Sequence, residues 1–281
     1  MGLRFSKMHG LGNDFAIVDC RRVPFDLDTD AIRRFADRHF GVGFDQLLTI
    51  LPTRDPACAV AYRVHNADGS TAGQCGNGVR CIARWLERDG AVTSRRFSLA
   101  GPSGPVAIEL QGDGRVTADM GEPDFNPAAV PIDPAAIPRG EDSVRFTHEA
   151  EGSNWTLGVV SMGNPHAIVA VTDAAAAPVA SLGPALGSAA MFPAGANIGF
   201  AERVAGNAIR LRVHERGAGE TLACGSGACA AVAVLRRRGE VDADVDVALP
   251  GGVLAIHWPG PGSTLRMTGP AVFVCDGDWN R

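Results

Sequence analysis

Two stretches of the chain show the hydrophobic spacing of helices. Over residues 79–86 the apolar side chains recur at i, i+3, i+4 and i+7, as in a helix that buries one face, and Gly90 lies just beyond its end. Residues 228–235 are apolar nearly all round, as in a helix that other structure encloses. Three arginines follow at 236–238, where cations complement the helix dipole, and Gly239 can cap the end. We therefore interpret these arginines as a helix terminus and not as a binding patch.

Shorter apolar segments between Gly, Asp and Pro residues predict strands. They include FAIVD, QLLTIL, VAIEL, HAIVAV and AIRLRVH, and near the N-terminus Leu3 and Phe5 occupy alternate positions of a first strand. The pattern predicts an α+β fold in which strands wrap around one mainly buried helix in each half of the chain.

Landmarks of the first half recur in the second half at a nearly constant offset. QCGNGVRC (74–81) matches LACGSGAC (222–229), and VHNADG (64–69) matches VHERGAG (213–219). The matched pairs are Cys75 with Cys224 and His65 with His214, each 149 residues apart, and Asn13 with Asn164 and Gln46 with Asn197, each 151 apart. Ordinary turn chemistry explains any one match, but not four in the same order. The order predicts a duplication, with a junction near residues 120–142, whose five prolines suit an irregular connection.

Composition limits the kind of partner. A chain of 281 residues with 46% hydrophobic residues can bury a large core and is long enough for two domains of ordinary size. Its net charge of −5 is spread without acidic or basic blocks, which favours a small molecule over nucleic acid or an anionic membrane as partner. The longest apolar run is far short of the roughly 20 residues of a membrane span, and residues 1–12 lack the apolar core of a signal peptide. We therefore expect a cytoplasmic protein.

Seven cysteines in a chain with no secretion signal predict reduced thiols and not a disulfide framework. The gap from Cys75 to Cys81 is too wide for a Cys-x-x-Cys pair, none occurs elsewhere, and the seven histidines are scattered. The sequence therefore predicts neither a metal site nor a thioredoxin-type redox centre.

Cys75 and Cys224 each stand directly before a glycine-rich turn that opens a predicted helix. Helix starts expose amide N–H groups, which attract anions, lower a cysteine pKa from about 8.5 and can hold a substrate carboxylate. If the two halves face each other, two such cysteines favour one thiolate and one thiol, the base and acid needed to invert a carbon. Free cysteines are more often small buried apolar residues, and we assign that role to Cys20, Cys58, Cys81 and Cys229.

A series of longer motifs lies between Lys7 and Val274. In order, these are KMHGLGNDF, GVGFDQ, NADGS, QCGNGVRC, SMGNPH, ANIGF, ERGAGET, ACGSGACAA, LPGG and MTGPAVFV. Together they resemble the motifs of the diaminopimelate epimerase family. The resemblance implies an isomerase that interconverts LL- and meso-2,6-diaminopimelate in lysine and peptidoglycan-precursor biosynthesis, with no cofactor, in particular no pyridoxal phosphate, and no metal.

The resemblance also assigns roles to individual residues. Cys75 and Cys224 match the acid/base pair, and the amides around Gly76-Asn77 and Gly225-Ser226 match those that hold the reacting carboxylate. The other residues that match substrate-binding positions are Asn13, Gln46, Asn66, Asn164, Asn197, Glu215 and Arg216. Arg216 is expected to bind the distal carboxylate through bidentate hydrogen bonds. His166 and Glu215 are expected to adjust the pKa values of the thiols. From the residues alone, His166 would be a loop histidine and Glu215-Arg216 a surface pair.

The fold implied by the resemblance has two pseudo-symmetric domains, each a mostly antiparallel strand barrel around a central helix, with the active site in the cleft between them. The first domain covers 1–120 and is completed by the last strand, about 270–281, and the second covers 121–269. The resemblance further implies a homodimer that binds diaminopimelate and neither nucleic acid nor membrane. Related sequences often carry Tyr at the position of Cys275, near the dimer contact, so this chain departs from its relatives there.

Two other functions use the same cysteines. Proline or hydroxyproline racemisation follows the same two-thiol logic in a related fold, but it predicts a pocket for one ring carboxylate without a distal recognition set. NADGS, ANIGF and ERGAGET favour a longer, doubly charged substrate. A thiol switch or ligand-binding module would bind without turnover, and an assay of optical rotation separates it from an epimerase.

Overall fold

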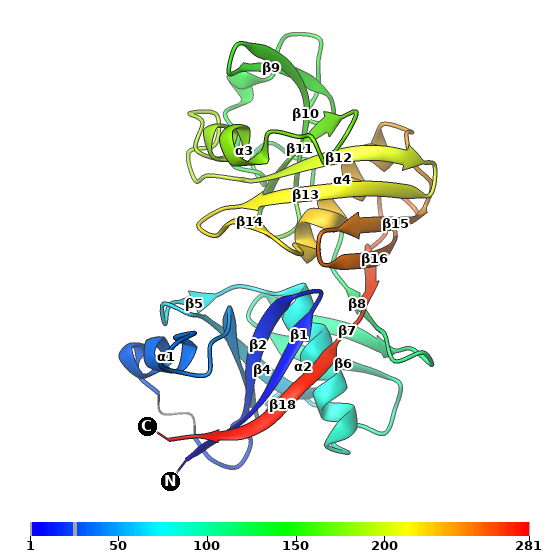
Figure 1. The fold of residues 1–281 in the computed structure, drawn as a ribbon. Coiled ribbons are helices and arrows are strands. Elements are labelled where there is room, and N and C mark those ends of the chain that lie inside the picture. The colour runs from blue at the N-terminus through cyan, green and yellow to red at the C-terminus, as the bar shows by residue number, and fades with distance from the viewer. Residues whose placement is uncertain (1, 25–26, 281) are drawn as a thin grey trace. The chain divides into compact units, whose positions relative to one another are not determined.

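The computed structural model describes residues 2–24 and 27–280, which fold as two units (Figure 1). Unit 1 comprises Met1–Asp119 and Thr268–Arg281, and unit 2 comprises Met120–Met267. The chain returns to unit 1 through its last strand, β18 (Val272–Trp279), which pairs antiparallel with the first strand, β1 (Leu3–Gly10). The amino- and carboxyl-terminal strands of the chain are therefore neighbours in one sheet.

Unit 1 is a mostly antiparallel sheet with two helices. Between β1 and β18 its elements are β2 (Asn13–Asp19), α1 (Thr29–Ala36), β3 (Gln46–Leu51), β4 (Cys58–Asn66), β5 (Thr71–Ala72), α2 (Gly76–Arg88), β6 (Arg96–Gly101), β7 (Gly104–Leu110) and β8 (Val116–Asp119). Pairing runs β18–β1–β2–β3–β4–β6–β7–β8, with β5 added to β4. Of the pairs named here, β2–β3 and β4–β6 are parallel, and α1 and α2 occupy these two crossovers.

Helix α2 is the helix around which unit 1 is built. It contacts β1, β2, β3, β7 and β8, strands from across the whole sheet. Because it meets strands on several sides, almost all of its residues from Gly76 to Leu86 are buried. It ends as the sequence predicts: Gly90 adopts φ 72°, a conformation that glycine accepts without steric cost.

Unit 2 repeats this construction. Its elements are η1 (Pro134–Ala136), β9 (Phe146–Ala150), β10 (Ser153–Ser161), β11 (Pro165–Val171), α3 (Val179–Gly187), β12 (Asn197–Ala205), β13 (Ala208–Glu215), β14 (Gly219–Thr221), α4 (Gly225–Arg237), β15 (Asp244–Leu249) and β16 (Gly252–His257), followed by β17 (Arg266–Gly269), which crosses the boundary. The parallel pairs, β11–β12 and β13–β15, recur at the equivalent crossovers. Helix α4 contacts β10, β11, β12, β13 and β16 and is buried from Gly227 to Leu235. The predicted α+β class is confirmed.

The proline-rich stretch 120–142 is packed as part of unit 2. The change of unit falls at its first residue, and Val130 and Ile132 join the core formed by Phe146 and Leu157. Asp124 forms an isolated bridge with Ser161, with backbone hydrogen bonds of 3.0 and 2.8 Å. The stretch holds no regular structure longer than η1, but Val130 and Ile132 are still buried.

Helices α1 and α3 are absent from the sequence prediction. Helix α1 has only 8 residues, although the Asp28 side chain caps it by accepting from the Ala31 amide at 2.7 Å. Helix α3 has 9 residues, carries Pro184 inside it and is mostly apolar, so it lacks a clear 3.6-residue period. No helix within the described part of the chain combines the length and apolarity needed to cross a membrane.

Candidate active site

Cys75 is the residue at which helix α2 begins. Its backbone is extended (φ −120°, ψ 108°), and its carbonyl accepts the first intrahelical bond, from the Val79 amide at 2.9 Å. The residues Gly76 and Asn77 that follow therefore form the first turn, where amide N–H groups have no partner within the helix. The half-buried thiol of Cys75 thus lies at the positive end of a helix dipole.

Two asparagines connect the Cys75 thiol to the neighbouring strand. Asn13, the first residue of β2, presents Oδ1 to the Cys75 sulfur at 3.9 Å. The same Oδ1 accepts from Asn77 Nδ2 at 3.2 Å, while Asn13 Nδ2 donates to Asp45 at 2.9 Å. Both ends of the Asn13 amide are therefore fixed.

Gln46 and Asn66 lie at the same end of the sheet, along the strand direction, as Asn13. Asn13 begins β2 and Gln46 begins the parallel strand β3, whereas Asn66 ends the antiparallel strand β4, where it pairs with Gln46 in register. Gln46 Nε2 donates to Asn66 Oδ1 at 3.0 Å, and Asn66 Nδ2 donates to Ser70 at 3.0 Å. We call the predicted residues at this end of the sheet the unit 1 cluster, namely Asn13, Gln46, Asn66, Cys75, Gly76 and Asn77.

Helix α4 begins at Cys224 in the same manner. Its backbone is again extended (φ −106°, ψ 106°), and its carbonyl accepts from the Ala228 amide at 3.0 Å. Unlike Cys75, however, Cys224 is only 3% exposed. Its sulfur lies 3.7 Å from the Ser226 hydroxyl. The two cysteines therefore share a backbone setting but differ in their exposure to solvent.

The surroundings of Cys224 favour the protonated thiol. Burial first, and then the negative charge of Glu215 and a hydrogen bond to it, raise the pKa of Cys224 well above its ordinary value. Hydrogen bonds from the Gly227 amide and the Ser226 hydroxyl act in the opposite direction and are outweighed. Glu215 is held in place by the Thr221 hydroxyl, which donates to it at 2.6 Å.

His166 is a buried, neutral histidine and not the loop histidine that its residue type alone suggested. It lies on β11 with 0% exposure, and its Nε2 is 3.1 Å from both Asn164 Oδ1 and Ser226 Oγ. Burial, assisted by the positive charge of Arg216, lowers the pKa of His166 to about 3. Its ring therefore orients the two polar residues beside Cys224 without adding a charge.

Arg216 follows β13 and is joined to Asn197, the first residue of β12. Asn197 Oδ1 accepts from the Arg216 amide at 2.9 Å, and Asn197 Nδ2 donates to the Pro165 carbonyl at 3.2 Å. The Arg216 side chain is exposed, donates from Nη1 to the Ala194 carbonyl at 2.6 Å, and makes no ion pair among the residues described. We call Asn164, His166, Asn197, Glu215, Arg216, Cys224, Gly225 and Ser226 the unit 2 cluster.

The candidate catalytic and substrate-binding residues thus fall into two clusters, one in each unit. The two clusters occupy equivalent places: Asn13 and Asn164 stand at or beside the start of β2 and β11, and Cys75 and Cys224 at the start of α2 and α4. The sequence analysis did not single out Thr221 or Arg80, which hold members of the clusters. Both lie inside quoted motifs, ERGAGET and QCGNGVRC, but only the folded contacts show what they touch.

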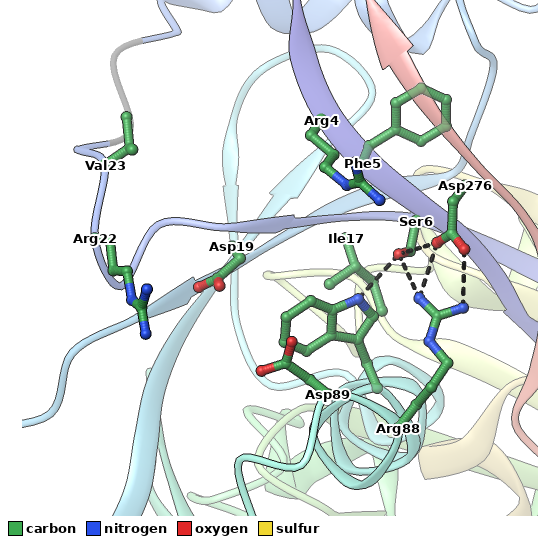
Figure 2. A pocket seen from close by; sticks show the side chains of 11 residues that line it. Arg4, Phe5, Ser6, Ile17, Asp19, Arg22, Val23, Arg88, Asp89 and Asp276 are labelled. Atoms are coloured by element: carbon green, nitrogen blue, oxygen red, sulfur yellow. Dashed lines mark hydrogen bonds and ion pairs between the residues drawn. The ribbon is translucent and has the colours of Figure 1, made fainter.

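A pocket of about 550 Å³ on unit 1 is lined by none of these residues (Figure 2). Ser6 links three other lining residues: Ser6 Oγ donates to Asp276 at 2.5 Å and accepts from Trp85 Nε1 and Arg88 Nη2, each at 2.9 Å. Arg88 also forms an ion pair with Asp276 at 2.8 Å. These bonds join β1, α2 and β18, so the polar groups of this pocket attach the last strand to unit 1.

No cluster of three or more His, Cys, Asp or Glu side chains suited to a metal ion occurs in residues 2–24 and 27–280. The polar groups of the two clusters are mainly amides, hydroxyls and thiols, together with Glu215, Arg216 and the neutral His166. Amides and a guanidinium suit carboxylates, and thiols suit proton transfer.

Comparison with known proteins finds one family across most of the chain. The family model described as diaminopimelate epimerase matches residues 5–126 and 158–274. The diaminopimelate epimerase of Xanthomonas axonopodis pv. citri (strain 306) is 51% identical over 280 residues, which cover 99% of this chain and 97% of that protein. That of Xanthomonas euvesicatoria pv. vesicatoria (strain 85-10) is 50% identical over 280 residues, with the same two shares covered.

Solved structures share the fold at low sequence identity. A probable proline racemase from Agrobacterium radiobacter K84 matches with a TM-score of 0.70 and 16% identity, over 98% of this chain and 92% of that one. A PhzF-family phenazine biosynthesis protein from Bacillus anthracis matches with a TM-score of 0.68 and 15% identity, over 100% of both chains. These structures show the architecture alone.

Proposed function

Because the chain belongs to the diaminopimelate epimerase family, we propose that it interconverts LL- and meso-diaminopimelate by two-base proton transfer at the α-carbon. The proposal places the protein in lysine and peptidoglycan-precursor biosynthesis. One observation carries the mechanism: each unit begins its buried central helix at a cysteine, and the two cysteines have different surroundings.

In the proposed reaction the two thiols act on opposite faces of one carbon. The Cys75 thiolate removes the α-proton and becomes a thiol, and Cys224 delivers its own proton to the other face and becomes a thiolate. Glu215 and burial support this starting state because they keep Cys224 protonated. The opposite reaction starts from the reversed protonation state.

The carboxylate on the reacting carbon needs stabilisation as negative charge develops. We assign this task to the first-turn amides at Gly76-Asn77 and Gly225-Ser226, since a helix N-terminus binds anions. Arg216, which is exposed and has no ion pair among the described residues, is assigned to the distal carboxylate. The asparagines and Gln46 complete the binding of the substrate's polar groups.

Two experiments test the mechanism: the reaction in heavy water and the substitution of each cysteine. Product formed early from LL-diaminopimelate should carry deuterium at the inverted carbon while unreacted substrate gains little, as NMR can measure. Cys75→Ala and Cys224→Ala should each abolish epimerisation and leave the fold intact by circular dichroism. Near-normal turnover by either variant would remove that cysteine from the mechanism.

Proline or hydroxyproline racemisation remains the second candidate. The probable proline racemase shares the fold, but the relatives that are about 50% identical are diaminopimelate epimerases. Arg216 also supplies a charge for a second carboxylate. Turnover of proline in preference to diaminopimelate would reverse this order.

We also propose that the protein acts in the cytoplasm as a homodimer. All seven cysteines are free, as in a reducing compartment, and β18 exposes Val272 (42%) and Val274 (57%) beside Cys275, apolar surface that a second copy could cover. Sedimentation at micromolar concentration tests the dimer, and a monomeric mass there would contradict it.

A further inference from the structure

Arg80 is a fully buried arginine in the second turn of α2. Its exposure is 0%, and it stands close behind Gly76 and Asn77 of the unit 1 cluster. Nη2 donates to Asn77 Oδ1 at 2.9 Å, Nη1 to the Gly76 carbonyl at 3.4 Å, and Nε to the Pro270 carbonyl at 3.3 Å. Burial of a guanidinium is costly, so these bonds hold it in a defined place.

The fold leaves space for this guanidinium at Gly10, the last residue of β1. A Cβ at that position would lie 3.1 Å from Arg80 Nη2 and 3.3 Å from Asn77 Cβ. A side chain at Gly10 would therefore have to displace Arg80 or Asn77 by a few tenths of an ångström. Pro270, which precedes β18, closes the other side through its carbonyl.

The bond from Arg80 decides which way the Asn77 amide points. Since Oδ1 of Asn77 accepts from Arg80, Nδ2 faces the other way and donates to Asn13 beside Cys75. A flipped amide would present an oxygen to Asn13 Oδ1 and lose both bonds. Arg80 therefore keeps the Asn77 donor on Asn13 Oδ1, the atom that lies 3.9 Å from the Cys75 sulfur.

The equivalent pair in the second unit is Asn164 with Ser226, which replaces Asn77. The hydrogen bond runs in the opposite direction, from Asn164 Nδ2 to Ser226 Oγ at 3.4 Å, and the buried group beside this pair is the neutral ring of His166. The residue 149 positions beyond Arg80 is Cys229, also 0% exposed and without charge. The duplication is thus broken by one buried positive charge, and it lies in the unit of Cys75.

We propose that Arg80 is a positioning residue of the unit 1 cluster, which fixes the Asn77 amide against Asn13 and whose buried charge favours the thiolate of Cys75. This inference rests on the proposed function. Because Arg80 has no charged counterpart in unit 2, the inference adds a reason why Cys75 is the thiol that ionises.

The other titratable groups around Cys75 do not supply such a charge. Burial, followed by the negative charge of Cys75, raises the pKa of Tyr62 on β4, so this phenol stays neutral. On α2 itself, burial raises the pKa of Cys81 to about 12, with Arg80 acting to lower it and Cys75 to raise it. Asp45, which accepts from Asn13, pairs with Arg38 at 2.7 Å, and the Arg38 side chain is 55% exposed. Arg80 is thus the fully buried cation among these groups.

Alkylation of Cys75 by iodoacetamide, a neutral reagent, tests the role of Arg80. The rate at each cysteine is followed by peptide mass spectrometry from pH 6 to 10 in the absence of substrate. Loss of a nearby cation raises a thiol's ionisation midpoint by about one pH unit, so Arg80→Gln should alkylate at Cys75 roughly tenfold more slowly at neutral pH. Arg80→Lys, which keeps a cation and one donor, should recover most of the rate, and kcat should follow the same order.

Two further variants make the result specific. Arg84→Gln removes an arginine one turn along α2 that pairs with Glu87 on the surface, so its Cys75 profile should match that of the wild-type protein. Gly10→Ala keeps the cation but places a methyl group against Arg80 Nη2, and should slow alkylation of Cys75 about threefold. If Arg80→Gln does not fold, Gly10→Ala and Arg80→Lys test the proposal in its place. An unchanged alkylation profile of Cys75 in Arg80→Gln would overturn the proposal. If Arg80→Gln does not fold, an unchanged profile in Gly10→Ala would do so. An equal loss of alkylation rate in Arg84→Gln would also overturn it. Since alkylation needs no substrate, a wild-type protein that fails to epimerise would refute the proposed function without deciding this one.

Discussion

At the scale of single residues, the two cysteines differ in what lies beside them. Cys75 is half-buried next to Asn13, with the buried Arg80 behind its helix turn. Cys224 is buried against Glu215 and remains a thiol at neutral pH. In the proposed mechanism, the matching cysteine motifs therefore act as a base and an acid because the charged groups beside them differ.

Arg216 is predicted to determine binding of the distal carboxylate. Loss of a charge-assisted hydrogen bond costs about 1.5–3 kcal/mol, so Arg216→Ala should raise KM for diaminopimelate roughly ten- to hundredfold. Arg216→Lys should also bind less well because an ammonium cannot reproduce the fork of a guanidinium.

The matched control for Arg216 is Arg210→Lys at the other end of β13. Arg210 pairs with Glu202 on the surface at 2.8 Å and should leave the steady-state kinetics unchanged. A normal KM in Arg216→Ala would show that another group reads the distal carboxylate.

His166 is predicted to make unit 2 sensitive to acid. Its pKa in the folded protein is about 3, below the ordinary value near 6.5, so as the pH falls the unfolded chain takes up the proton first. Stability is therefore lost as the pH falls from about 6.5 toward 3. At pH 5 the loss from this one group is about 2 kcal/mol.

Urea unfolding of the wild-type protein and His166→Gln at pH 7.5 and pH 5.0 checks this value. The stability advantage of the wild-type protein over the variant should shrink by about 2 kcal/mol between the two pH values, because other titrating groups cancel in the comparison. An advantage that is the same at both pH values would mean that folded His166 carries a proton.

At the scale of elements, the starts of α2 and α4 share a glycine-rich turn but differ in the space around it. A Cβ at Gly227 would lie 3.2 Å from both Cβ and Sγ of Cys224 and 3.1 Å from Val213. Gly227→Ala should therefore displace the sulfur by a few tenths of an ångström. Since proton transfer depends strongly on position, we expect kcat to fall on the order of tenfold with little change in KM.

The equivalent substitution in α2 is the matched control. A Cβ at Gly78 would meet the end carbons of Leu48 at 3.1 and 3.2 Å, and a leucine side chain can move. Gly78→Ala should keep nearly normal kcat in the same assay. Equal losses in the two variants would point to a general effect of alanine in the first turn and not to contact with Cys224.

At the scale of the whole molecule, the chain builds unit 2 from one continuous segment and unit 1 from both of its ends. The Trp279 ring stacks on Phe35 with centroids 4.6 Å apart and attaches β18 to the unit 1 core. Trp279→Ala should lower the free energy of unfolding of unit 1 by about 1–3 kcal/mol. Hydrogen exchange should then become faster in β1 and β2 and stay unchanged in β12 and β13.

Trp155→Ala should give the reverse pattern. Trp155 packs on the unit 2 core and donates to the Ala150 carbonyl at 3.2 Å, so its loss should expose β9 and β10 and leave unit 1 protected. If either variant accelerated exchange equally in both units, the two units would unfold as one cooperative body.

The sequence by itself determined the α+β class, the two central helices and the family. Residues 79–86 and 228–235 carry the helix periodicity or a continuous apolar run, and the glycines and cysteines around them mark helix ends, all of which are local signals. The repeated landmarks located both cysteines at helix starts because helix initiation depends on a few adjacent residues.

Only the tertiary structure decided how each thiol is surrounded. Arg80 and Cys229 occupy matching positions of the motifs, and the structure shows that both are fully buried, the charged one included. His166 is neutral because distant strands and α4 exclude water from it. Helix α3 and the buried residues of 120–142 likewise depend on a core assembled from distant segments. Burial and charge are set by non-local contacts, which a local pattern of residue types does not contain.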